Sequence, residues 1–230
     1  MSLKPTKKSD AGKDWMRNRR ASNRKLCSEY HLIITEGKRT EPEYFRGLQR
    51  AINSQYGKRE KIRLEIHGEG VNTIQLVQEA RKIIRNSATI YSHVWIVYDT
   101  DDFPAANVNQ PVDDSRRFSN DDTTYHAIWS NQCIELWFLL HFSYIDSDLC
   151  RDVYGSKLTA ALTAIGVQSG YHKDRPDMFE ILRPYIDCAI RNAKKLDDVN
   201  KGKQPSNAAP GTKVYEVIDY LWPYLSDQNN

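Results

Sequence analysis

The segment HVWIVYDTDD, residues 93–102, decides the fold of this chain. Its first six residues are mostly β-branched, aliphatic or aromatic, which is typical of a strand buried on both faces of a parallel sheet. Asp99, Thr100 and Asp101 follow at once, so the apolar run ends abruptly in charge. Such a strand predicts an α/β protein with a polar site at the carboxyl edge of its sheet.

Strand and helix patterns alternate on both sides of this segment. Further strands are predicted at residues 30–35, 61–67 and 123–129. Helices are predicted from Thr40 to before Gly57, from 72 or 73 to about 84, and over 132–141, 156–165, 176–196 and 212–225, with residues 103–121 a long loop holding a short helix near 113–117. This order predicts a doubly wound, mainly parallel sheet with helices on both faces.

Three regions are expected along the chain. Residues 1–28 form a basic, disordered arm, 29–145 the α/β core, and 146–230 a helical C-terminal region packed on that core. Residues 1–25 contain nine Lys or Arg but two Asp or Glu, although the net charge is only +3. The arm is therefore either a segment that attracts polyanions or a solubilising tail.

The composition narrows the class of protein. With 40% hydrophobic and 27% charged residues, the 230-residue chain is typical of a soluble globular protein. No apolar run reaches the roughly 20 residues that a membrane span needs, and no apolar stretch follows the basic N-terminus as in a signal peptide. We therefore expect a cytoplasmic protein without a membrane partner. The four cysteines have neither zinc-site nor disulfide-framework spacing.

Carboxylates follow two of the predicted strands. Glu36 comes just after the first strand, and Asp99 and Asp101 just after the third. Because the carboxyl ends of parallel strands meet at one edge of the sheet, these side chains are expected to converge. Oxygen ligands suit Mg²⁺ or Mn²⁺, which would also offset the repulsion between the carboxylates. Asp102 is a further candidate metal ligand, and Glu135 a candidate catalytic residue in a predicted buried helix.

The order of these acids separates several phosphoryl-transfer folds. Haloacid-dehalogenase phosphatases have Asp-x-Asp after the first strand, where this chain has Glu36. Response-regulator receivers have paired acids there, and this chain has no second acid beside Glu36. Glu first and Asp-x-Asp later resembles the Toprim fold of topoisomerases, bacterial primases and related nucleases.

Three blocks extend the resemblance to one family. Ile33–Phe45, Val94–Phe103 and Ser130–Phe142 are similar to the signature blocks of the RloB family, and the similarity spans roughly residues 30–225. The third block is the most specific, although Asn131-Gln132 stands where the family has Asn-Pro. The resemblance implies a Toprim-like fold and Toprim metal roles for Glu36, Asp99 and Asp101. It also implies a function in bacterial defence, often beside an ATPase partner.

Basic residues supply the candidate contacts to nucleic acid. Lys38 and Arg39 follow Glu36, where cations could stabilise the charge on a metal-bound phosphate. Arg116 and Arg117 could guide a strand across the predicted loop, although exposed surface charge explains all four residues equally simply.

Two functions therefore remain open. The first is a Mg²⁺-dependent endonuclease that hydrolyses DNA or RNA in anti-phage, abortive-infection defence, with Glu36, Asp99, Asp101 and Glu135 as catalytic residues and an ATPase as partner. The second is a non-catalytic Toprim-fold effector or docking subunit of an ATPase-containing defence complex.

Overall fold

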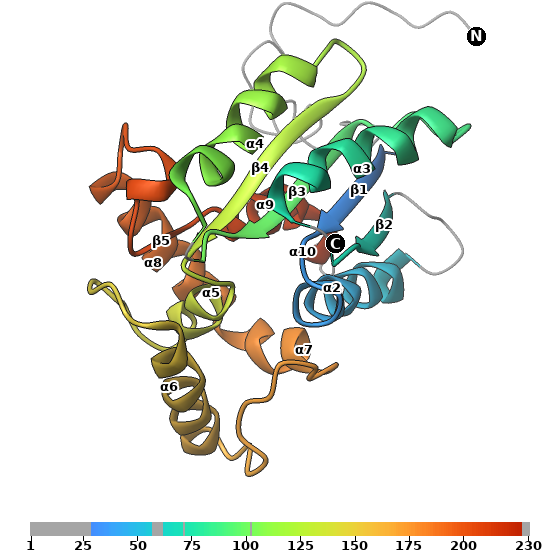
Figure 1. The fold of residues 1–230 in the computed structure, drawn as a ribbon. Coiled ribbons are helices and arrows are strands. Elements are labelled where there is room, and N and C mark those ends of the chain that lie inside the picture. The colour runs from blue at the N-terminus through green and yellow to red at the C-terminus, as the bar shows by residue number, and fades with distance from the viewer. Residues whose placement is uncertain (1–28, 57–61, 71, 102, 227–230) are drawn as a thin grey trace, which may run out of the picture.

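The computed structural model describes residues 29–56, 62–70, 72–101 and 103–226, and its centre is one five-stranded sheet (Figure 1). The expected arm, residues 1–28, lies outside the described residues, as does Asp102. The strands are β1 (Glu29–Thr35), β2 (Ile62–Gly68), β3 (His93–Asp99), β4 (Thr124–Asn131) and β5 (Gly211–Thr212). All four predicted strands are confirmed, and the chain is an α/β protein.

The strand order is β2-β1-β3-β4-β5. The first four strands are parallel, and β5 pairs antiparallel with the end of β4. In register, Thr35 lies beside Val97 and Asp99 beside Ser130. The carboxyl ends of β1, β3 and β4 are therefore neighbours at one edge, as the sequence predicts.

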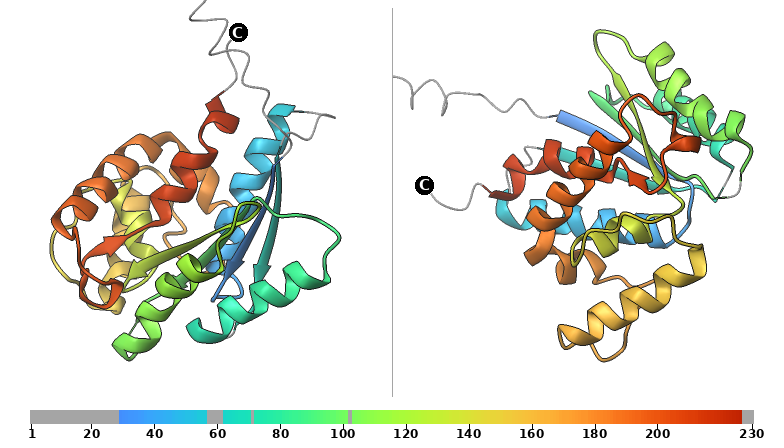
Figure 2. Two further views of the ribbon diagram at one scale, coloured as in Figure 1. Left: turned by 90° about the horizontal axis from the view of Figure 1, so that it is seen from above. Right: turned by 90° about the vertical axis from the view of Figure 1, so that its left-hand side faces the viewer.

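Helices cover both faces of the sheet (Figure 2). Helices α3 (Thr73–Asn86) and α4 (Ala105–Phe118) lie on one face, where they pack on Leu32 and Ile34. The other face carries the side chain of Ile33 and the remaining helices: α2 (Thr40–Tyr56), α5 (Glu135–Leu140), α6 (Arg151–Ala164), α7 (Met178–Leu182), α8 (Ile186–Val199), α9 (Val214–Leu221) and α10 (Pro223–Ser226). Successive residues of β1 thus point to opposite cores, which explains its continuous apolar run.

Helix α4 corrects the prediction of a long loop at 103–121. It spans 14 residues, begins directly after Pro104 and contains Pro111. Val108, Pro111 and Ser115 are buried at helical spacing against α3 and the sheet, and the Tyr98 hydroxyl donates a hydrogen bond of 3.0 Å to the Val108 carbonyl oxygen. Tertiary packing of this face outweighs the helix-breaking tendency of an internal proline.

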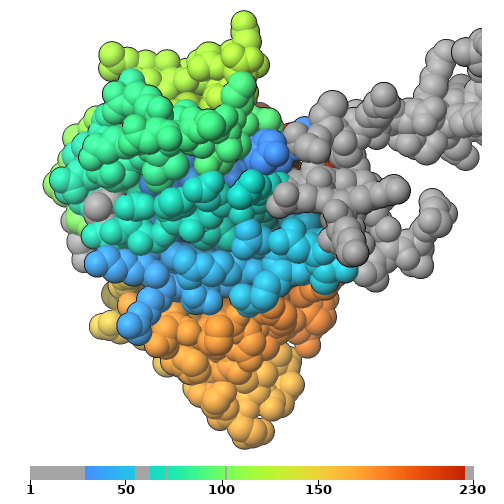
Figure 3. Space-filling view, turned by 90° about the vertical axis from the view of Figure 1, so that its right-hand side faces the viewer, coloured from blue at the N-terminus to red at the C-terminus, as the bar shows by residue number. Residues whose placement is uncertain are grey.

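The C-terminal half also differs from the predicted helices. Helix α6 begins at Arg151, five residues before the predicted start, and the predicted helix 176–196 is broken by a 3-10 turn at Arg183–Tyr185 that contains Pro184. Residues Gly211–Thr212 form a strand instead of starting a helix. Helix α7 packs against α2, as Figure 3 shows in orange beside blue and cyan.

The hydrophobic core crosses the expected boundary at residue 145. Tyr154, Leu158 and Leu162 of α6 belong to the same buried cluster as Ile33 and Trp95 of the sheet. The segment α5–α7 lies beyond the carboxyl edge of the sheet (Figure 1), so residues of α6 can reach the ends of the strands. No helix in the described part of the chain is long and apolar enough to cross a lipid bilayer.

Candidate acidic site at the carboxyl edge of the sheet

Glu36 and Asp99 lie at neighbouring strand ends, as predicted. The Glu36 amide donates a hydrogen bond of 3.0 Å to the Val97 carbonyl oxygen, which continues the pairing of β1 and β3. The Glu36 carboxylate accepts a hydrogen bond of 3.1 Å from Thr73, the first residue of α3. Asp99 is 7% exposed, and its Oδ1 accepts a bond of 3.0 Å from the Ile134 amide. Both carboxylates are held by local structure.

Asp101 is joined to Asp99 by a residue from the C-terminal half, Arg151. The backbone of Asp101 has φ 37°, in the left-handed region that Asp adopts more readily than most residues. One Arg151 guanidinium nitrogen contacts Asp101 Oδ1, and the other is 3.7 Å from Asp99 Oδ2. The guanidinium therefore neutralises part of the negative charge of the Asp-x-Asp pair.

Two more buried carboxylates, Glu41 and Glu135, complete the cluster. Glu41 is in the first turn of α2 and is 6% exposed, and Glu135 opens α5 and is 4% exposed. A Cβ at position 37 would collide with the Glu41 carboxylate, so Gly37 permits this close approach. The Tyr171 hydroxyl donates a hydrogen bond of 2.8 Å to Glu135 Oε1.

The pKa of Glu36 shows how these acids affect one another. Burial raises this pKa, the negative charges of Asp101 and Glu41 act in the same direction, and the result is a pKa of about 7. The hydrogen bond from Thr73 opposes the shift but does not cancel it.

Asp99 and Glu41 are shifted in the same direction. Burial raises the pKa of Asp99 well above its usual range, and the charges of Glu41 and Glu135 add to this effect, while Arg151 opposes it. Burial likewise raises the pKa of Glu41, with Glu135 contributing. The cluster therefore holds more negative charge than Arg151 neutralises, and an added cation would relieve it.

Cations surround the cavity next to these acids. The cavity has a volume of about 300 Å³, and its lining includes the acids Glu41, Asp99 and Glu135. Four basic residues also line it: Lys38, Arg39, Arg151 and Lys173. Arg39 forms an exposed ion pair of 3.3 Å with Asp174, whereas Lys38 and Lys173 have no ion pair with another described residue. The cavity thus combines an acidic cluster with basic groups suited to an anion.

The donor set suits a hard divalent cation, although its side chains are not arranged around one. Among the described residues, no group of three or more His, Cys, Asp or Glu side chains has the arrangement of a metal site. The cluster nevertheless offers only carboxylate oxygens, the ligands that Mg²⁺ and Mn²⁺ prefer. Because Arg151 contacts both Asp99 and Asp101, a cation at this pair would have to displace it.

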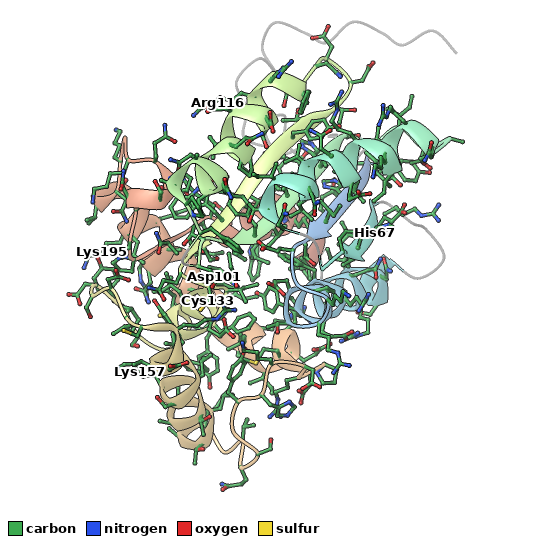
Figure 4. All side chains as sticks on the ribbon, in the orientation of Figure 1. His67, Asp101, Arg116, Cys133, Lys157 and Lys195 are labelled. Carbon is green, nitrogen blue, oxygen red and sulfur yellow. The ribbon has the colours of Figure 1, made fainter. Side chains whose placement is uncertain are left out.

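The predicted basic residues divide into two groups. Lys38 and Arg39 line the cavity beside the acids. Arg116 and Arg117 are in the last turn of α4, roughly 16 Å along the helix from its start near the site, and Figure 4 shows Arg116 well away from Asp101. Arg116 pairs with Asp113 at 3.5 Å. The structure therefore does not bring this second pair to the acidic edge.

Sequence reasoning missed Arg151, Lys173 and Tyr171. All three come from the region after residue 145 and reach the site only through the packing of α6 and the segment that follows it. No local motif marks them. Glu41 had one signal in the sequence, because it is an acid in the first turn of the helix that follows Glu36, and that turn starts at the same edge of the sheet.

Comparison with known proteins identifies the family. The model of the RloB-like protein family matches residues 31–221. No curated protein and no solved structure shows significant similarity to the chain. Since the match covers most of the sequence and includes every described residue of the acidic cluster, the chain belongs to the RloB-like protein family.

Proposed function

We propose that the protein is a metal-dependent nuclease with a Toprim-like fold. The observation that carries this proposal is the cluster of five carboxylates at one sheet edge, next to a cavity that basic residues also line. A cluster with only a structural role gives no reason to bury acids whose negative charges raise one another's pKa values, because such acids do not stabilise the fold. Phosphodiester cleavage needs both features, a hard cation and positive groups around the phosphate.

Each residue has a defined role in this proposal. Glu36, Asp99 and Asp101 hold Mg²⁺ or Mn²⁺, with Asp102 a further candidate ligand. The metal, when bound, supplies Lewis acidity and lowers the pKa of water. Glu36 accepts the proton of the attacking water, because a buried carboxyl with a pKa near neutrality is a suitable general base. Glu135, which is also buried in the cluster, is the alternative acceptor.

The basic residues hold the substrate in this mechanism. Lys38, Arg39 and Lys173 contact phosphate oxygens at the cavity. Arg151 lines the same cavity and, once released from the aspartates, would contact the scissile phosphate and stabilise the charge that develops on it.

The biological setting is proposed from the family. Resemblance to RloB proteins supports a cytoplasmic role in bacterial anti-phage defence, with an ATPase as partner and DNA or RNA as substrate. The similarity covers residues 31–221, so the basic segment before Glu29 lies largely outside it.

Cleavage assays with neutral variants test the nuclease. Asp101→Asn and Asp99→Asn keep the size of the side chain but remove a charge, and each is expected to lower Mg²⁺-dependent cleavage of single-stranded DNA or RNA at least about 100-fold. Asp113→Asn is the matched control, because Asp113 is an exposed acid on α4 and should leave cleavage unchanged. Wild-type rates in the Asp101→Asn protein would contradict the proposal.

A second candidate is a non-catalytic docking subunit. The ion pairs of Arg151 with Asp99 and Asp101 favour it, because they stabilise the acids without a metal, and the described acids are not arranged as a metal site. In that case Asp101→Asn and Arg151→Met should both weaken binding of the ATPase partner, and neither DNA nor RNA should be cleaved. Metal-dependent cleavage that Asp101→Asn abolishes would exclude this candidate.

A further inference from the structure

A second cavity, of about 260 Å³, adjoins the acidic site. Its lining comes from the turn after β3, the start of α4, the end of β4 and the turn after it, the segment before α6 and the loop before β5. Asp101 lines this cavity and Asp99 lines the first one, and Arg151 contacts both aspartates. The two cavities are therefore on either side of the same short turn.

The walls of the second cavity are fixed by hydrogen bonds. The amides of Thr100 and Asp101 donate to the carbonyl oxygens of Ser130 and Gln132, at 3.0 and 3.1 Å, which extends the pairing of β3 with β4. The Asn109 side chain donates to Ser206 Oγ at 3.0 Å and ties the loop before β5 to α4. The cavity is preformed and needs no rearrangement to accept a small group.

Thr100 points to a ligand. Thr100 is 2% exposed and is one of the residues that line the cavity. Its hydroxyl has no hydrogen-bond partner among the described residues. Buried hydroxyls nearly always have a partner, so a ligand with a donor or an acceptor would satisfy this group.

The charges of the lining limit what that ligand can be. Asp101 and Asp148 contribute carboxylates, and no Lys or Arg among the described residues lines the cavity. A phosphate would be repelled here, in contrast to the first cavity. An uncharged group that offers N–H donors fits better, because carboxylates only accept hydrogen bonds.

Phe103 adds a flat apolar contact. It is 39% exposed, which is unusual for a large apolar side chain of this protein, and it lines the same cavity. Aromatic side chains that stand beside polar groups are the usual way in which proteins hold an unpaired base, by stacking and by hydrogen bonds to its edge.

We propose that this cavity binds a nucleobase of the substrate, next to the cleaved phosphate, and prefers bases with an exocyclic amino group. Asp148 accepts hydrogen bonds from the amino group, Thr100 bonds a second edge atom, and Phe103 packs against the ring. The inference deepens the proposed nuclease function and rests on it for the position of the phosphate. It does not need a metal for the base to bind.

Cytidine and uridine provide the test, because they differ only at the edge that the cavity would read, with an amino group and an accepting N3 in cytidine against an oxo group and an N3–H donor in uridine. Both lack the phosphate that the first cavity would attract. Binding of each to the full chain is measured by ligand-observed NMR without divalent metal. Cytidine is expected to bind at least about fivefold more tightly than uridine, as one hydrogen bond implies. Equal binding of the two, or binding of neither, would overturn the proposal.

Two variants assign the contacts. Thr100→Val should weaken cytidine binding about fivefold, while Ser115→Ala, which removes another buried hydroxyl without a described partner and outside the cavity, should not. Asp148→Asn, at an exposed position where folding is not at risk, should abolish the preference for cytidine. If Asp148→Asn leaves the preference intact, the proposal is wrong even if Thr100→Val fails to fold.

These experiments can contradict the proposed nuclease and the proposed base site independently of each other. Cytidine selectivity without any cleavage would support the base site and contradict the nuclease. Cleavage without cytidine selectivity would do the reverse.

Discussion

The two ends of the parallel sheet both bury ionisable groups, but one end holds acidic side chains and the other holds neutral histidines. At the carboxyl edge, carboxylates gather around Arg151. At the amino end, three histidines from β1, β3 and β4 stack: His31, His93 and His126. Both clusters come from neighbouring strands, so the sheet brings them together in the same way. The comparison shows which end needs a ligand.

Hydrogen bonds hold most of the histidine end together in its neutral form, although His31 Nε2, 3.4 Å from a Glu29 carboxylate oxygen, has no hydrogen-bond partner among the described residues. The Trp95 indole donates to His31 Nδ1 at 3.1 Å. His93 bridges its neighbours, with Nδ1 3.0 Å from His126 Nε2 and Nε2 2.7 Å from the Tyr220 hydroxyl. Burial lowers the pKa of His31 to about 3 and of His126 to about 4, so both are uncharged at neutral pH.

The acidic side chains at the carboxyl edge cannot form a comparable set of hydrogen bonds with one another. Neutral imidazole can both donate and accept, so a row of histidines forms its own bonds. Carboxylates can only accept while ionised, and their charges repel. We infer that the histidine end stabilises the fold, whereas the acidic end is kept for a cation and a substrate. Three measurements test this contrast between the two ends of the sheet.

The largest expected effect is on stability at the histidine end. His31 is fully buried, so His31→Ala leaves a cavity and an unpaired Trp95 indole, and should lower the free energy of unfolding by about 3 kcal/mol. Urea denaturation measures this loss. His172→Ala, at an exposed histidine, is the control and should change stability by less than about 0.5 kcal/mol. A small loss in His31→Ala would show that the cluster is not structural.

The next effect is a pH dependence of stability from the same residue. The pKa of His31 falls from 6.5 in the unfolded chain to about 3 in the folded protein, so the unfolded state binds the extra proton as pH falls below 6.5. The stabilisation is complete above pH 6.5, and about 2 kcal/mol is lost by pH 5.

The same measurement on His31→Phe isolates this effect. Burial raises the pKa of Glu36 to about 7, which pushes stability in the opposite direction as pH falls, but that contribution cancels in the difference between wild type and variant. The other titratable groups near His31 are Glu29, His93, His126 and Tyr220, and all of them are still present in the variant. Parallel curves for the two proteins would contradict a neutral buried His31.

The smallest effect is stabilisation of the acidic end by metal. Millimolar Mn²⁺ should raise the free energy of unfolding by about 1 kcal/mol, as expected for a ligand at several times its Kd. Arg151→Met should enlarge this gain, because it removes the cation that competes for Asp99 and Asp101. Lys157→Met removes a charge from an exposed position of the same helix, α6, and should not. The absence of any Mn²⁺ effect in wild type and in Arg151→Met would count against a metal site.

Local sequence predicts much of the sheet and little of the helical half. The sequence offers either Asn72 or Thr73 as the cap of α3, and the structure shows that Asn72 fills this place, since its side chain accepts a 3.0 Å hydrogen bond from the Gln75 amide. Such caps involve residues a few positions apart. Only a short helix near 113–117 is predicted where α4 spans Ala105–Phe118. The stability of the full helix comes from a buried face that only the sheet and α3 complete, and Pro111 is a residue that normally breaks a helix.

The sequence alone predicts the strands β1, β3 and β4. It also predicts the position of Glu36 at the end of β1 and of Asp99 and Asp101 at the end of β3. A strand buried on both faces leaves a continuous apolar run, and the residue that ends the run must lie at the sheet edge. Only the tertiary structure decided which residues surround those acids. Arg151 is 50 positions from Asp101, and no local pattern encodes a partner that arrives through the packing of a distant helix.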